Sequence, residues 1–160
     1  VMKMPGRSMS AGGRAPTVLF HDEEAGRKLL LRLGAGGEGL PAHVIPLEVT
    51  HVASVAPELV LACLAWGCVH VAVLATGIEA PAYLDALHAQ SAWIGQVTSG
   101  LGMGGGGVSV IEADEPALLG EMLRSLPGIQ SPPPATFALP AGRRAAAARN
   151  IFPNSIRPRQ

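Results

Sequence analysis

The sequence predicts an α/β fold, a three-layer sandwich in which helices cover both faces of a four-stranded parallel sheet. Three observations predict it. Residues 16–126 alternate four times between a short apolar stretch and a stretch of helical character. The segment VHVAVLA (69–75) is apolar on both faces, as expected for a strand covered on both sides. A chain of 160 residues, 48% hydrophobic and 15% charged, can bury such a core. We expect a flavodoxin/Rossmann-like strand order, 2-1-3-4.

The central apolar segment, residues 59–78, carries no formal charge over twenty residues and is long enough to span a bilayer. Two features argue against a span: Glu58 and Glu79 flank it instead of basic residues, and His70 would lie in hydrocarbon without a visible partner. Gly67 also divides it into a Leu/Ala-rich half and a Val-rich half. We therefore predict a helix that ends at Gly67 and a strand that follows it, with no membrane span.

The other elements follow from apolar periodicity and from the positions of Gly and Pro. Pro46 implies that the second strand lies at an edge of the sheet or ends there. Asp22, Ser54 and Asp114 are predicted to cap the helices that follow them. The predicted strands are 16–22, 42–49, 69–75 and 108–113, and the predicted helices are 23–37, 55–66, 81–102 and 114–126.

The domain organisation follows from composition. We expect a flexible N-terminal segment over 1–15, the α/β domain over 16–126, and a Pro-rich linker with a basic C-terminal tail over 127–160, within which 141–150 has helical propensity. The tail is interpreted as solvated, with docking to an acidic partner or an anionic lipid as the alternative. Twelve basic and twelve acidic residues cancel, so we expect no nucleic-acid partner.

The cysteine content is low. Cys63 and Cys68 are the only two cysteines, which does not indicate a disulfide framework and favours a reducing compartment, the cytoplasm. A zinc or iron–sulfur site would need further thiolates or suitably placed histidines. We interpret Cys63 as a small hydrophobic residue of the helix and Cys68 as part of the turn.

Acidic and histidine side chains follow the predicted strands, where parallel sheets bind their ligands. As an enzyme site they would form a general acid–base or metal cluster. The structural interpretation, in which several of them cap helices, is favoured, and no catalytic, cofactor-binding or metal-binding residue is assigned. His70 is expected to be buried and hydrogen-bonded. The candidate strand-end residues are His21, Asp22, His51, Glu79, Glu112 and Asp114.

Two other motifs are excluded as nucleotide sites. The glycine-rich stretch GLGMGGGG (100–107) precedes a strand, whereas phosphate loops run from a strand into a helix. The segment HDEE (21–24) is acidic where a pyrophosphate would lie, which argues against a dinucleotide site.

Five phrases of the sequence, in this order, resemble bacterial multi-cluster 4Fe-4S ferredoxin-type proteins. They are GGRAPTVLFHDEEAG (12–26), GLPAHVIPLEVTHV (39–52), LACLAWG (61–67), VSVIEADEPALLGEML (108–123) and FALPAGRR (137–144). In that family such a stretch is a non-cluster α/β insert between cysteine-rich modules. It is distantly similar to the α/β domain of the hydrogenase iron–sulfur (delta) subunit. Where that domain carries cysteines, this chain has TGIEAPAY (76–83), so the resemblance carries over no cluster ligand.

The resemblance implies an accessory or scaffold domain of an iron–sulfur electron-transfer protein. The chain itself would hold no cofactor, 4Fe-4S clusters would belong to a full-length parent, and the partners would be a redox protein or neighbouring ferredoxin modules. This favours a domain that is not an enzyme.

Two alternatives stay open. One is a small-molecule-binding or hydrolytic α/β enzyme, which a deep pocket joining His21, His51 and Glu112 would favour. The other is a self-associating module, a homodimer through the apolar face of the helix over 83–99.

Overall fold

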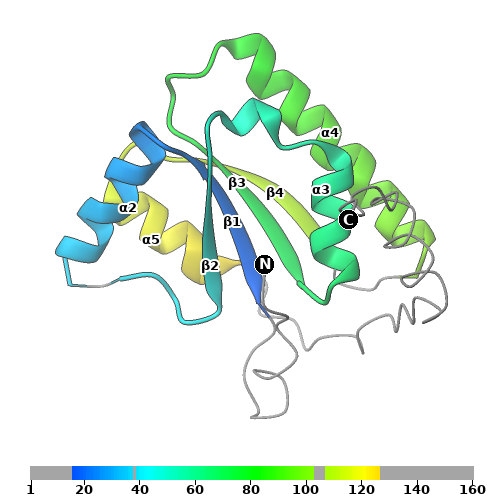
Figure 1. Cartoon of the computed structure of the whole chain (residues 1–160), viewed down its shortest axis with the longest axis horizontal. Helices are drawn as coiled ribbons and strands as arrows, with labels where there is room; N and C mark the ends of the chain where they lie inside the picture. Colours follow the sequence, from blue (N-terminus) through cyan, green and yellow to red (C-terminus); the bar gives the residue numbers. More distant parts are fainter. Residues whose placement is uncertain (1–15, 38, 103–106, 127–160) are drawn as a thin grey trace, which may run out of the picture.

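The computed structural model describes residues 16–37, 39–102 and 107–126. Its four strands, β1 (Thr17–Asp22), β2 (Val44–Val49), β3 (His70–Ala75) and β4 (Gly107–Glu112), form one sheet in the order β2-β1-β3-β4 (Figure 1). All three strand pairs are parallel. The predicted fold class and strand order are therefore confirmed. Pro46 lies in β2 at an edge of the sheet, as predicted.

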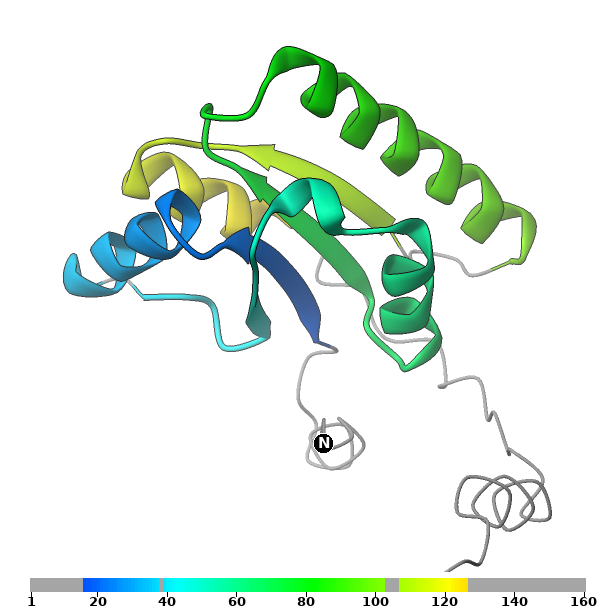
Figure 2. The same cartoon turned by 45° about the horizontal axis from the view of Figure 1, so that its top comes forward.

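Helices cover both faces of the sheet (Figures 1 and 2). On one face lie α2 (Ala25–Ala35) and α5 (Pro116–Ser125), which contact each other. On the other face lie α3 (Pro57–Ala65), α4 (Pro81–Gly100) and a short 3-10 helix, η1 (Val52–Ser54). The helix after β1 and the helix after β2 thus pack on opposite faces, and the sheet has its topological switch point between β1 and β3.

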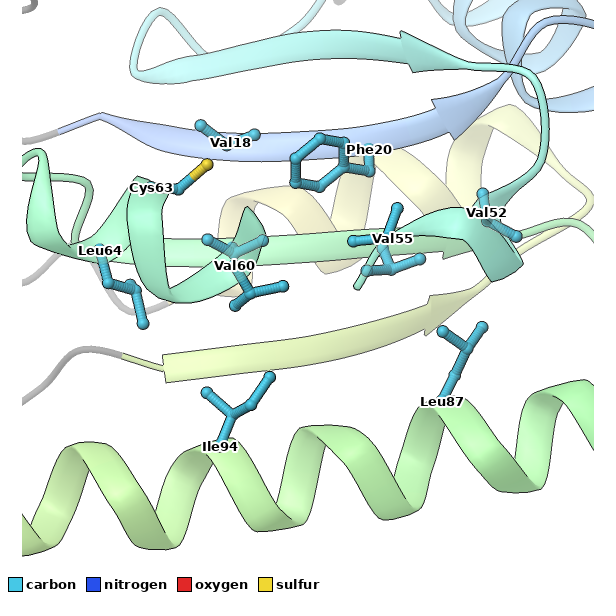
Figure 3. Close-up of a cluster of buried hydrophobic side chains, with 11 residues drawn as sticks. Val18, Phe20, Val52, Val55, Val60, Cys63, Leu64, Leu87 and Ile94 are labelled. Atoms are coloured by element: carbon cyan, nitrogen blue, oxygen red, sulfur yellow. The ribbon is translucent and has the colours of Figure 1, made fainter. Parts of the chain in front are cut away.

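Two hydrophobic cores result from the alternation of side chains along the central strands. In β1, Val18 and Phe20 face α3 and α4, whereas Leu19 faces α2 and α5. Every residue of β1 and β3 is buried. Figure 3 shows the first core, in which α3 lies over the central strands and α4 runs alongside β4 and directs Leu87 and Ile94 toward the sheet. Its members are Val18, Phe20, Val52, Val55, Val60, Cys63, Leu64, Val71, Val73, Leu87 and Ile94.

The central apolar segment bends at Gly67, as predicted. Gly67 has φ +97°, a left-handed conformation that suits glycine. Its N–H donates to the carbonyl of Leu64 (3.0 Å), and the N–H of Cys68 donates to the carbonyl of Cys63 (3.1 Å). This pair of bonds is a Schellman motif, which ends α3 and directs the chain into β3. In the described part of the chain, no helix is long and apolar enough to cross a membrane.

The predicted caps at Ser54 and Asp114 are wrong. The Ser54 hydroxyl belongs to η1 and donates to the carbonyl of His51, while α3 begins at Pro57. At α5, Glu115 occupies the N-cap position and makes no side-chain capping bond. The physical reason is that α3 and α5 start with proline, which has a helical φ and no N–H to satisfy. The predicted segments 1–15 and 127–160 and the helix propensity at 141–150 lie outside the described residues.

Candidate functional site

A cleft of about 460 Å³ opens at the carboxyl ends of β1, β2 and β3. It lies beside the switch point between β1 and β3, where open α/β sheets bind their ligands. The loops after these three strands and the start of α4 form its wall. The lining residues are Asp22, Glu23, Glu24, Thr50, His51, Val52, Ala53, Ile78, Glu79, Ala80, Tyr83 and Leu87.

Asp22 ends β1, is buried, and holds the start of α2. Its Oδ1 accepts the N–H groups of Glu24 (2.8 Å) and Ala25 (2.7 Å), and its Oδ2 accepts the N–H of Gly26 (2.9 Å). A carboxylate is favoured here because the first N–H groups of a helix have no partner within the helix. Burial acts to raise the pKa of Asp22, but the N–H bonds from Gly26, Glu24 and Ala25 outweigh it and the pKa is lowered. Asp22 is therefore a charged group in which three of about four lone-pair sites are already engaged by the backbone.

Glu79 is engaged in the same way by the loop after β3. Its carboxylate accepts the N–H of Thr76 (3.1 Å to Oε2) and the N–H of Gly77 (2.9 Å). Gly77 has φ +83°, which lets this tight loop form. Two carboxylates of the cleft thus close their own loops and are poorly placed to exchange protons with a ligand.

The rest of the cleft combines an apolar floor with an acidic rim. Val52 and Leu87 are buried beneath it, whereas His51, Glu23 and Glu24 are exposed around it. None of the described residues that line the cleft is Lys or Arg. The charged side chains of its lining are therefore all carboxylates, which favours a neutral or cationic ligand over an anion.

The structure brings together three of the six sequence-predicted residues. Asp22, His51 and Glu79 line the cleft, whereas His21, Glu112 and Asp114 do not. His21 is buried toward α2, where its Cβ lies 3.0 Å from the position that a Cβ on Gly26 would take. Its Nδ1–H donates to the carbonyl of Asp22 (2.9 Å).

Glu112 ends β4 and pairs with His88 of α4, with 2.8 Å between Oε1 and Nε2. Asp114 lies beyond β4 and is exposed. No partner for His88 could be predicted from the sequence, because this pair depends on α4 lying over β4. The one feature of the sequence that points to this pair is the carboxylate at the end of β4, on the face that α4 covers. Among the described residues, no group of three His, Cys, Asp or Glu side chains is arranged to hold a metal ion.

His70, the first residue of β3, is buried and hydrogen-bonded, as predicted. Its Nε2 lies 2.9 Å from the Ser109 hydroxyl of β4, and its Nδ1 has no hydrogen-bond partner among the described residues. The ring lies over Gly107, since a Cβ there would be 2.8 Å from Nδ1. Burial lowers the pKa of His70, because the charged imidazolium is poorly solvated in this position.

We expect the domain to lose stability as pH falls below 6.5 because of His70. In the unfolded chain His70 has a pKa near 6.5, whereas in the folded state its pKa is lower. The contribution of His70 to the free energy of unfolding is therefore fully present above pH 6.5 and is lost as pH falls from 6.5 to the lower folded pKa. For one group the slope is at most about 1.4 kcal/mol per pH unit. Urea unfolding of wild type and His70→Gln between pH 5 and 7 would measure it, with the exposed His51→Gln as control. Equal slopes for wild type and His70→Gln would contradict the assignment.

Comparison of the chain with protein-family models found no match, and comparison with curated protein sequences found no significant match.

Proposed function

We propose that residues 16–126 form an accessory domain of an iron–sulfur electron-transfer protein of the cytoplasm, with no catalysis of its own. The domain would hold neighbouring ferredoxin modules, or dock a redox protein, at a fixed separation. Its fully buried central strands and its two cores support this role, because a rigid spacer needs a packed interior. The 4Fe-4S clusters would belong to the parent protein.

The absence of catalysis is proposed because of the hydrogen bonds that Asp22 makes. A general base needs a free lone pair directed at the proton that it removes. The Asp22 carboxylate instead accepts three backbone N–H groups, and Glu79 accepts two. His21 and Glu112, which a deep acid–base pocket would need beside His51, lie outside the cleft.

The parent protein provides the test. Sequencing the DNA on both sides of this segment should find cysteine-rich ferredoxin modules in the same reading frame. In that parent, replacing residues 16–126 with a Gly/Ser linker of similar reach should leave iron and sulfide content unchanged and slow electron transfer between modules. An unchanged transfer rate would refute a spacer role. Stoichiometric iron and sulfide in the isolated 160-residue chain would refute the statement that it holds no cluster.

A second candidate function, small-molecule binding, is favoured by the cleft itself. A volume of about 460 Å³ suits a small ligand, and the acidic rim selects a neutral or cationic one. Binding without proton transfer is compatible with engaged carboxylates, whereas the hydrolytic version of this alternative is not supported by their hydrogen bonds.

We expect a polyamine to bind the cleft and a nucleotide not to bind. Calorimetric titration with spermidine should show saturable binding to wild type, and ADP at the same concentration should show none. Ala53→Trp, which fills the cleft from its exposed wall, should weaken spermidine binding at least tenfold. Leu118→Trp is the control, since Leu118 is exposed on α5, away from the cleft. Spermidine binding that Ala53→Trp leaves unchanged, or equal binding of ADP, would contradict this candidate.

Self-association through α4 is the third candidate. Leu87 and Ile94 of α4 bury against the chain's own sheet, but Tyr83 (57% exposed) and Trp93 (50% exposed) remain on its surface. Light scattering should then report a dimer that Trp93→Ser converts to a monomer. A wild-type monomer at high concentration would exclude it.

A further inference from the structure

The two cysteines of the chain meet at the C-terminal end of α3. Cys63 lies in the last turn of the helix, and Cys68 is the second residue after the residue that caps it. The N–H of Cys68 donates to the carbonyl of Cys63 over 3.1 Å, as the Schellman motif requires. With standard bond lengths, this bond keeps the two Cα atoms no farther apart than about 7 Å, and closer for any bent arrangement. Disulfide-linked Cα atoms are usually about 4.4–6.8 Å apart.

Their side chains share one environment but differ in access. In Schellman motifs the side chains at these two positions frequently contact each other. Cys63 is 2% exposed and belongs to the first core, and Figure 3 shows its sulfur directed toward Val18 of β1. Cys68 is half-buried and packs against the same core. Cys68 is thus the more exposed of the two cysteines, and Cys63 is its buried neighbour.

We propose that Cys63 and Cys68 form a reversible intramolecular disulfide when the folded chain meets a small-molecule disulfide such as oxidised glutathione. The Cys68 thiolate attacks one sulfur of glutathione disulfide, forming a mixed disulfide and releasing one glutathione thiolate. The Cys63 thiolate then attacks Sγ of Cys68, closing the bond and releasing the second glutathione. The two cysteines lose two protons and two electrons, and the electrons reduce one glutathione disulfide to two thiols.

The first step should be slow and the second fast. Burial, together with the neighbouring Cys63, raises the pKa of Cys68 to about 11, and burial raises the pKa of Cys63. Few thiolates therefore exist at neutral pH, which limits the initial attack. Closure follows from proximity, because the backbone hydrogen bond already holds the two residues together. The mixed disulfide should not accumulate.

The test uses the whole 160-residue chain, in which these are the only cysteines. Folded protein is incubated with oxidised glutathione at mildly alkaline pH and analysed by mass spectrometry. We expect a monomer lighter by two hydrogen atoms, with a 63–68 disulfide in its peptide map and full reversal by dithiothreitol. A stable glutathione adduct or a disulfide-linked dimer would overturn the proposal. The proposal would also be overturned if both thiols of the folded chain stayed unmodified over a time in which both thiols of the urea-unfolded chain react.

Two variants separate the roles of the thiols. Cys63→Ala should stop at a stable glutathione adduct on Cys68, because no second thiol resolves it. Cys68→Ala should stay unmodified while folded, because Cys63 is buried. Circular dichroism tests whether each variant is folded. If a variant is not folded, the peptide map of the wild-type protein alone decides the outcome. A glutathione adduct on Cys63 in folded Cys68→Ala would contradict the assigned order of attack.

Discussion

Replacing Asp22 with Ala is expected to lower the free energy of unfolding by about 2–4 kcal/mol, because it removes the acceptor of three backbone N–H groups at once. The N–H of Gly26 is buried and would be left without a partner, whereas those of Glu24 and Ala25 can partly turn to water. The negative charge at the start of α2 is also lost. Urea unfolding at neutral pH measures the change.

Two variants control this prediction. Glu23→Ala removes the neighbouring exposed carboxylate and should change stability by no more than about 0.5 kcal/mol. Asp22→Asn keeps one acceptor oxygen and should lie between Asp22→Ala and wild type. If Asp22→Ala and Glu23→Ala were equally stable, the carboxylate would not hold the helix start as described.

The same carboxylate predicts a dependence on acid. Its folded pKa is lowered from 3.8, so its contribution is complete above that value and is lost as pH falls through the lower folded pKa. Asp22→Asn should lack this part of the acid transition. Unfolding curves between pH 2 and 5 for both proteins would compare them, and an unchanged acid transition in Asp22→Asn would contradict the pKa assignment.

Gly107→Ala is expected to destabilise the domain by about 1–3 kcal/mol, because the added methyl group has no space. Its Cβ would lie 2.8 Å from Nδ1 and 2.9 Å from Cε1 of His70. The His70 ring is buried and bonded to Ser109, so it cannot move aside without losing that bond.

A double-mutant cycle identifies the cause. In a His70→Ala background the clash is absent, and adding Gly107→Ala should cost little. Gly95→Ala is the matched control: Gly95 lies in the interior of α4, a Cβ there meets nothing within 4 Å, and the change should stabilise by about 0.5–1 kcal/mol. Additive effects of His70→Ala and Gly107→Ala would contradict the clash.

Most of the fold could be predicted because its signals are local. The Val-rich strands, the glycine that ends α3 and the proline in β2 each act through neighbouring residues. Their alternation with helices predicts the parallel sheet, whereas the order 2-1-3-4 was expected only as a common order for such sheets. The capping role of Asp22 was also predictable, because its three partners lie within four residues.

The candidate site could be predicted only in part, because it depends on distances across the sheet. Strand ends alone do not distinguish Glu79, which faces the cleft, from Glu112, which pairs with His88 across 24 positions of sequence. His21 and Asp22 are adjacent in sequence and both lie beside Gly26 of α2, yet only Asp22 lines the cleft. Which strand-end residues reach the cleft becomes clear only when the register and the helix positions are known.

The Asp22 contacts have one more consequence. In many doubly wound proteins the first helix of the sheet offers its N–H groups to a bound phosphate. Here the Asp22 carboxylate already accepts the N–H groups at the start of α2. A dissolved phosphate would have to displace this carboxylate, which is part of the chain and cannot diffuse away. Converting this scaffold into a nucleotide binder would therefore have to begin by shortening that one side chain, with the loss of stability compensated elsewhere.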